Sequence, residues 1–289
     1  MKLLFYSFLI IPLISSLIYI FKNENFNSYS IQNKINDSLD NNFTYSLGII
    51  PHFDCKNFDF LEYYDMIDFI NINHKNDSIY KKPKISIKIS HLSDNKKEQW
   101  KIFKSLVDYA YHKDIMIWIS TVRYIDIKNE YEFFFKTKDL NYTNIGITLS
   151  TYNKDIFQKV ENVINHNGSI RLVKGYYSGN IKEWGIVTEN YKLVAQKLIE
   201  DKNYHVLATH DFEILNYLKD KFNKKFDFQE LNFFYNSRNF VLKKVKNFTN
   251  PKGFYISFGN NYNYITSNIF VLDITNILSR KIKYLQYMF

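Results

Sequence analysis

The stretch Arg171-Leu-Val-Lys-Gly-Tyr-Tyr177, followed by Leu207-Ala-Thr-His-Asp211, places polar and charged residues at the ends of two short apolar segments. Each apolar segment has the length and β-branched content typical of a buried strand, and an amphipathic helical pattern over residues 188–201 lies between them. A strand, a helix and a second strand in this order predict two parallel strands joined by a right-handed crossover.

The same alternation continues along the chain from about residue 45. The predicted strands are 45–50, 85–90, 115–120, 145–150, 169–174, 205–209, 226–231 and 253–257. The predicted helices are 98–111, 155–165, 188–201, 211–221 and 238–246, and the acidic segment 58–80 is expected to be a helix followed by a loop. About eight parallel strands can close a (β/α)8 barrel. An open doubly wound sheet is the structural alternative, but no strand is followed by the Gly-rich turn of a dinucleotide-binding fold.

Composition narrows the function classes. The chain has 289 residues, 46% of them hydrophobic, and can bury the core of one large domain or two modest ones. Its net charge of +9 comes from lysines scattered along the whole chain, which indicates a solvated surface and no nucleic-acid partner. The single cysteine, Cys55, excludes an intrachain disulfide, and no Cys/His spacing resembles a metal site.

The N-terminal residues predict a membrane connection. Residues 3–21 form an almost unbroken apolar run, long enough to cross a bilayer as a helix, so residues 1–22 are expected to be a membrane anchor or a secretory signal. A buried helix of the fold is the alternative. Mitochondrial targeting is not supported, because no arginine precedes Arg123. Residues 23–44 predict a polar linker, and residues 45–289 the folded domain.

The chemistry of a parallel barrel gathers at the carboxyl ends of its strands, so the residues after each apolar run are candidates for a site. The candidates are Lys88, Arg171, Lys174, Thr209, His210, Gln229 and Tyr255. Several cations at one barrel mouth predict an anionic ligand or cofactor, although surface salt bridges at the strand ends are the alternative.

The order and spacing of these pieces, from about residue 85 to 270, resemble the proline dehydrogenases. Arg-Leu-Val-Lys-Gly-x-Tyr at 171–177 with Ala-Thr-His at 208–210 is the strongest part. Lys-Ile-Ser at 88–90, Phe-Gln at 228–229 and Tyr-x-x-Phe-Gly at 255–259 reinforce it through their order. The resemblance implies a distorted (β/α)8 barrel and FAD-dependent oxidation of proline, or a similar small amine, to pyrroline-5-carboxylate by hydride transfer to flavin N5.

The resemblance also implies roles for individual residues. Arg171 would lie beside the reactive edge of the flavin, and the other cofactor contacts would come from Lys174, Gly175, Thr209, His210 and Gln229. Lys88 would face the substrate carboxylate. The walls of the substrate pocket would be formed by Leu172, Tyr177 and Tyr255. A quinone is the candidate electron acceptor of a membrane-bound member of such a family.

Four positions depart from the family pattern. Ser120 and Val122 replace an Asp-x-Glu, Ser150-Thr151-Tyr152 replaces Gln-x-Tyr, and Ser178 replaces a tryptophan. The fourth departure is in residues 264–271, which lack the Arg-Arg pair that grips the substrate carboxylate in the family.

Three hypotheses therefore stay open. The first is a divergent, membrane-tethered flavoenzyme of this type. The second is a degenerate barrel that keeps the fold and acts by binding. The third is an unrelated structural glycoprotein, based on the apolar N-terminus and on Asn-x-Ser/Thr triplets such as that at Asn36.

Overall fold

The structure, a computed structural model, describes residues 44–49, 60–73, 83–121, 124–174, 180–209, 211–221, 227–231 and 252–258. Eight strands pair in the order of the sequence, every pairing is parallel, and the last strand pairs with the first, so that the sheet closes into a barrel. The strands are β1 Thr44–Ile49, β2 Lys84–Ile87, β3 Met116–Ile119, β4 Ile145–Ser150, β5 Ser169–Val173, β6 Val206–Ala208, β7 Asp227–Leu231 and β8 Lys252–Phe258.

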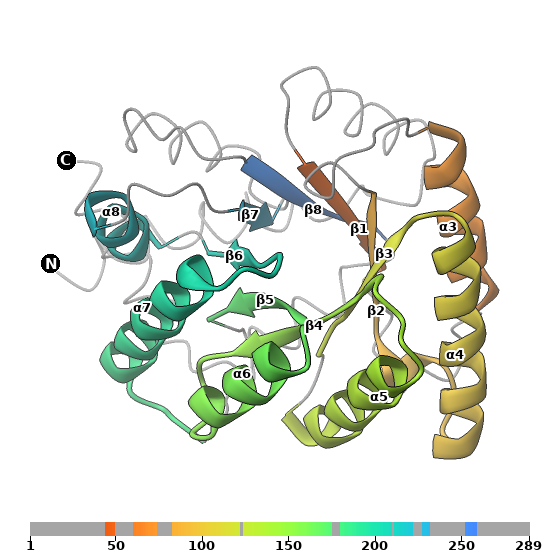
Figure 1. Cartoon of the computed structure of the whole chain (residues 1–289), viewed down its shortest axis with the longest axis horizontal. Helices are drawn as coiled ribbons and strands as arrows, with labels where there is room; N and C mark the ends of the chain where they lie inside the picture. The colour runs from red at the N-terminus through yellow and green to blue at the C-terminus, as the bar shows by residue number, and fades with distance from the viewer. Residues whose placement is uncertain are drawn as a thin grey trace, which may run out of the picture.

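One α-helix follows each of the first six strands in the described part of the chain. These helices are α3 Leu61–Asn73, α4 Lys96–His112, α5 Ile127–Asp139, α6 Ile156–Asn165, α7 Trp184–Glu200 and α8 Phe212–Lys221. Two 3₁₀ turns, η2 Ile89–His91 and η3 Tyr124–Asp126, precede α4 and α5. The strands lie at the centre and the helices pack around them (Figure 1). The structure therefore confirms the predicted parallel α/β barrel.

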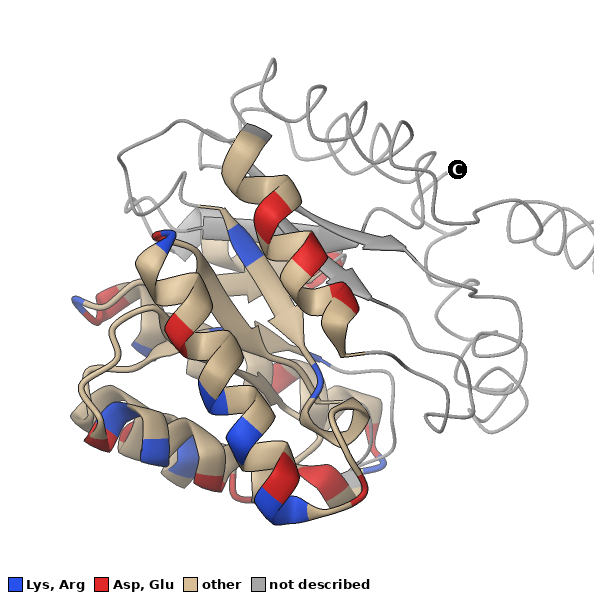
Figure 2. Ribbon diagram, turned by 90° about the vertical axis from the view of Figure 1, so that its right-hand side faces the viewer, with Lys and Arg blue, Asp and Glu red and all other residues tan. Residues whose placement is uncertain are grey.

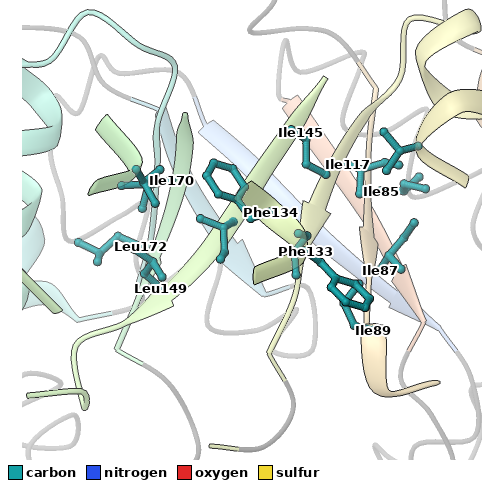
Figure 3. Packing of buried hydrophobic residues seen from close by; sticks show 14 of the residues in the cluster. Ile85, Ile87, Ile89, Ile117, Phe133, Phe134, Ile145, Leu149, Ile170 and Leu172 are labelled. Carbon is teal, nitrogen blue, oxygen red and sulfur yellow. The ribbon is translucent and has the colours of Figure 1, made fainter. Parts of the chain in front are cut away.

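Successive side chains of a strand point to opposite faces of the sheet, so every second residue can enter the core between the strands and the helices. Every second residue of β2 to β5 is a buried Ile or Leu that belongs to one large apolar cluster with the inner faces of the helices. Figure 3 shows Phe133 and Phe134 of α5 among the buried isoleucines and leucines of strands β2 to β5. Because parallel strands of a barrel are covered by helices, this burial supplies most of the apolar stabilisation of the fold.

The predicted strands agree with the observed strands to within a few residues, and β4 agrees at both ends. The acidic segment contains α3, as predicted. Helix α5 was not predicted from the sequence, because the run Phe133-Phe-Phe135 breaks its amphipathic pattern and aromatic residues are weak helix formers. Phe133 and Phe134 are buried in the apolar cluster, where α5 packs against β4 and Phe133 lies against Phe103 of α4.

Two predicted segments, the N-terminal hydrophobic helix within residues 1–22 and the helix at 238–246, lie outside the described residues. None of the helices in the described ranges combines the length and the apolar character that crossing a bilayer requires. The membrane anchor therefore stays a prediction.

Figure 2 shows that positions occupied by Lys or Arg and positions occupied by Asp or Glu are both distributed over the outer helices. Several lysines form ion pairs between neighbouring helices, among them Lys96 with Glu132 and Lys197 with Glu161, both at 2.5 Å. Exposed pairs of this kind contribute roughly 0–1 kcal/mol each. Stability therefore depends on the buried core.

The inner face of the barrel near the amino ends of its strands is filled by large side chains. Met116, Trp118, Tyr204 and Val206 form a buried cluster. Gly146 pairs with Trp118 in the register of β3 and β4, and a Cβ atom at position 146 would lie 2.3 Å from the indole ring. The indole thus occupies the space that a side chain on residue 146 would need.

We expect Gly146→Ala to lower the free energy of unfolding by about 1–3 kcal/mol, because Trp118 is buried and must shift to admit the methyl group. Gly185→Ala in the first turn of α7 is the matched control, since a Cβ there meets nothing within 4 Å. The control should be neutral or stabilising by up to about 1 kcal/mol. Urea unfolding monitored by circular dichroism measures both, and equal stability of the two variants would contradict the packing described.

His205 joins β5 to the segment that leads into β6. Its Nδ1 accepts a hydrogen bond from the backbone N–H of Ile170 at 3.1 Å, and its Nε2 lies 2.9 Å from Asp201 Oδ2. The ring is therefore neutral, with the proton on Nε2. Burial lowers the pKa of His205 below 6.5, and the hydrogen bond to Asp201 opposes this only in part.

Because the folded-state pKa of His205 is lowered, its contribution to stability should be complete above about pH 6.5 and should decline as the pH falls from 6.5 toward the folded-state value. The loss is about 1.4 kcal/mol for each unit by which the pKa is lowered. Unfolding free energies between pH 5 and 8 should fall less steeply on acidification in His205→Gln than in the wild type. His112→Gln, at an exposed position, should follow the wild type.

Candidate functional site at the carboxyl end of the barrel

Arg171 lies inside the barrel and is 5% exposed. Its three guanidinium nitrogens donate to three hydroxyl groups: Nε to Thr148 Oγ1 at 3.0 Å, Nη1 to Ser86 Oγ at 2.8 Å, and Nη2 to Ser120 Oγ. The guanidinium carbon is 5.8 Å from the centre of a Trp118 ring. A residue of β5 that reaches both β2 and the end of β3 must cross the interior, so the guanidinium lies inside the barrel.

Lys88 lies immediately after β2. Its backbone is extended (φ −107°, ψ 112°), so the alternation of the strand continues and places it on the same face as Ser86. The residue is 7% exposed, and its backbone N–H donates to the hydroxyl of Tyr63 at 3.1 Å. The structure thus brings Lys88 to the same side of β2 as the hydroxyl that binds Arg171.

Lys174, one residue beyond β5, is bound on the helical side of the barrel. Its ammonium donates to Asp211 Oδ2 at 2.6 Å and to Thr188 Oγ1 at 2.8 Å, and it lies 3.3 Å from the centre of the Trp184 ring. The side chains of Lys174 and Asp211 are 8% and 17% exposed. The pair is therefore screened from water and joins the end of β5 to α7 and α8.

Asp211 uses its second oxygen to begin α8. Oδ1 accepts the backbone N–H of Glu213 at 2.9 Å, which is the bond of an N-cap residue, while the hydroxyl of Thr209 accepts the N–H of Asp211 at 3.1 Å. The charge of Asp211 also affects Tyr191. Burial of the Tyr191 ring, and to a smaller extent the negative charge of Asp211, raise the pKa of Tyr191 well above its usual value. The Tyr191 phenol therefore stays neutral and donates to the carbonyl of Leu172 at 3.2 Å.

Ser150 ends β4 and ties it to the next strand. Its hydroxyl donates to the carbonyl of Lys174 at 2.7 Å and accepts the N–H of Tyr152 at 3.3 Å. The resemblance placed a glutamine of the family at this position. In this chain the Ser150 hydroxyl forms hydrogen bonds with two backbone groups, so it stabilises the rim of the barrel.

The predicted site residues separate into three groups. Arg171 and Lys88 lie on inward-facing strand positions, whereas Lys174 and Thr209 meet Asp211 at the rim. Leu172 belongs to the outer core between β5 and the helices, so it is not brought together with Arg171. For Gln229 in β7 and Tyr255 in β8 the structure describes the backbone, and Gly175, Tyr177 and His210 lie outside the described residues.

Several residues that bind the predicted residues were not predicted from the sequence. They are Ser86, Thr148, Trp184, Thr188 and Asp211. The signal for Ser86 is present in Lys84-Ile-Ser-Ile-Lys88, where polar residues alternate with isoleucine and mark an inner face. The contacts to Trp184 and Asp211 have no such signal, because they join residues that are distant in the chain.

The charges of the site suit an anionic or electron-rich ligand. Among the described side chains, three hydroxyls bond the guanidinium of Arg171, Lys88 lies on the same side of β2 as Ser86, and the buried ammonium of Lys84 lies 5.2 Å from the centre of the Tyr204 ring. In the described part of the chain, no group of three or more His, Cys, Asp or Glu side chains is placed to hold a metal ion. The buried guanidinium of Arg171 could stabilise negative charge on a ligand, such as that at the edge of a reduced flavin. The ammonium of Lys174, by contrast, forms an ion pair with Asp211.

Proline dehydrogenase 2 of Bacillus subtilis strain 168 is 30% identical over 34% of this chain and 35% of its own length, and the protein of the same name from Bacillus subtilis subsp. natto matches equally. No family model matches the chain. Proline utilization A of Bdellovibrio bacteriovorus, inactivated by N-propargylglycine, superimposes with a TM-score of 0.74 at 14% identity, over 90% of this chain and 32% of the other.

A variant of proline utilization A from Bradyrhizobium japonicum gives a TM-score of 0.68 at 17% identity, over 82% of this chain and 29% of its own. The resemblance to the proline dehydrogenases is confirmed. The matched segment spans about a third of the length of the curated proline dehydrogenases. At 14–17% identity the solved structures show a shared barrel, and activity has to be argued from the site.

We expect Asp211→Asn to lower the free energy of unfolding by about 3 kcal/mol, because it removes the counterion of a buried ammonium while its amide oxygen can still cap α8. Asp211→Ala should cost about 1 kcal/mol more, since the cap is lost as well. Chemical denaturation of both variants, with Lys174→Met in a double-mutant cycle, measures the pair. Additive losses from Lys174→Met and Asp211→Asn would contradict the ion pair.

Proposed function

We propose that the protein is a flavin-dependent oxidoreductase of the proline dehydrogenase type, which oxidises L-proline or a similar small cyclic amine. The observation that carries the proposal is the buried guanidinium of Arg171, fixed inside the barrel by three hydroxyls. FAD bound at this end of the barrel would accept the hydride from the carbon beside the substrate nitrogen. The relationship to proline dehydrogenases supports this cofactor and this substrate class.

The chain's own residues would supply charge, orientation and a dry environment. Arg171 holds a permanent positive charge at a position fixed before any ligand arrives, so it can stabilise negative charge without reorganisation. Lys88 is buried at the end of β2, on the side that faces the barrel interior, and would bind the substrate carboxylate. Lys174 and Asp211 hold the ends of β5 and β6 together, which keeps the strand that carries Arg171 in place.

A degenerate barrel that binds a ligand without oxidising it is the second candidate. Two observations favour it. The hydroxyl of Ser120, at a position where the resemblance implies a carboxylate, accepts a hydrogen bond from Arg171. The ammonium of Lys174 is bonded to Asp211. Under this proposal the barrel keeps its architecture and has lost the groups that grip an amino acid.

The visible absorption spectrum of the purified full-length chain, before and after anaerobic addition of excess proline, separates the two candidates. A flavin band that bleaches with proline supports the oxidoreductase. A band that persists with proline and with other cyclic amines supports the binding role. A protein that shows no band after incubation with FAD would overturn the proposed cofactor.

If the protein binds FAD, Arg171→Ala should raise the dissociation constant of FAD by roughly ten- to a hundredfold, because a charge-assisted contact contributes about 1.5–3 kcal/mol. The dissociation constant of Arg171→Lys should lie between those of the wild type and Arg171→Ala, since lysine keeps the positive charge and lacks the planar guanidinium. Quenching of FAD fluorescence measures both. Lys182→Ala, at an exposed position, is the control and should bind FAD as the wild type does. Equal affinities for all variants would refute the role of Arg171.

A further inference from the structure

Lys88 lies beyond the point where the pairing of β2 with β1 ends. That pairing runs as far as Gly48 and Ser86, two residues before Lys88. On the other side of β2, the carbonyl of Ile87 accepts the N–H of Ser120 at 2.8 Å, so residue 87 turns its backbone groups toward β3. Because the backbone groups of successive strand residues point to opposite sides, the N–H of Lys88 points toward β1 and the helix that follows it.

Tyr63 supplies a hydrogen-bond acceptor on that side. It lies in the first turn of α3, and its hydroxyl accepts the N–H of Lys88 at 3.1 Å. The carbonyl of Lys88 accepts the N–H of His91 at 3.1 Å, where η2 begins. Both backbone groups of Lys88 are therefore held, one by a side chain of α3 and the other by the next turn, and its backbone stays extended at φ −107° and ψ 112°.

The ring of Tyr63 gives this contact a rigid support. The residue is 0% exposed and belongs to the apolar cluster between the strands and the helices. Packing of a tyrosine ring fixes the place of its oxygen, since two side-chain torsions define the whole group. Tyr63 lies on the helical side of β2, whereas Lys88 continues the face of Ser86 toward the interior of the barrel. Tyr63 can therefore act on a ligand in the barrel only through Lys88.

We propose that Tyr63 is a positioning residue for Lys88. Its hydroxyl extends the hydrogen bonding of β2 by one residue, so that the side chain of Lys88 keeps the inward direction of the strand. The inference rests on the proposed function for the ligand, which is the substrate carboxylate that Lys88 would bind. It deepens that function by naming the group that sets the direction of the ammonium. Without the hydroxyl, residue 88 loses this acceptor and can turn with η2, which moves the ammonium away from the ligand.

The first test needs no substrate. Tyr63→Phe keeps the ring and removes the hydroxyl, so the backbone amide of Lys88 should exchange with solvent about tenfold faster or more, measured relative to the amide of Ile147 in β4. Tyr64→Phe is the matched control, because it makes the same change at the next residue of α3, where the hydroxyl donates to Ser105 Oγ of α4 at 2.8 Å. The control should leave the exchange of Lys88 unchanged. Hydrogen exchange followed by NMR measures both variants.

The second test measures the effect on the substrate. In the FAD-bound protein, Tyr63→Phe should raise the KM for proline about five- to tenfold and change kcat by less than about twofold, because a displaced ammonium weakens carboxylate binding while the flavin stays in place. In a Lys88→Ala background, where KM is already raised, Tyr63→Phe should have no further effect on KM. Tyr64→Phe should keep the wild-type KM, and circular dichroism checks that each variant is folded.

Equal exchange of the Lys88 amide in the wild type, Tyr63→Phe and Tyr64→Phe would overturn the positioning role. A rise in KM that Tyr63→Phe causes equally with and without the Lys88 side chain would also overturn it, since such an effect would not pass through the ammonium. A wild-type protein that does not oxidise proline would refute the proposed function. In that case, faster exchange of the Lys88 amide confined to Tyr63→Phe would still support the hold of Tyr63 on Lys88.

Discussion

The alternation of side chains along the parallel strands is the constraint on which the rest of this structure depends. One face of β2 to β5 must bury isoleucine and leucine against the helices, and this leaves the other face to fill the interior of the barrel. Near the amino ends that interior is packed with Trp118, Met116, Tyr204 and Val206. Toward the carboxyl ends it holds Arg171 and its three hydroxyls. The fold and the candidate site are thus two faces of the same strands.

Much of this architecture could be predicted because strand and helix periods are local signals. The predicted strand at 145–150 has the same bounds as β4, and the polar residues that end the predicted strands identified Arg171 and Lys174 as candidates for the site. Helix α5 was not predicted because its three consecutive phenylalanines obscure the helical period, although two of them, Phe133 and Phe134, are buried in the core. The partners of Lys174 could not be predicted either, since an ion pair between residues 174 and 211 exists only after β5 and β6 are paired.

This chain and the proline utilization A structures share one barrel architecture at low sequence identity. At 14–17% identity the architecture persists, because any apolar residue of suitable size satisfies the outer face of a strand. The inner face is less permissive, since a buried cation needs partners with defined geometry. In this chain the hydroxyls of Ser86, Ser120 and Thr148 are such partners of Arg171.

The carboxylate of Asp211 has a mechanical consequence. One oxygen holds the ammonium at the end of β5, and the other holds the first turn of α8. Fluctuations that open either contact therefore weaken both, so the end of β5, the loop after β6 and the start of α8 should open and close as one cooperative unit. Slow exchange of backbone amides would then be gained or lost together over these segments, although they are separated by more than thirty residues of sequence.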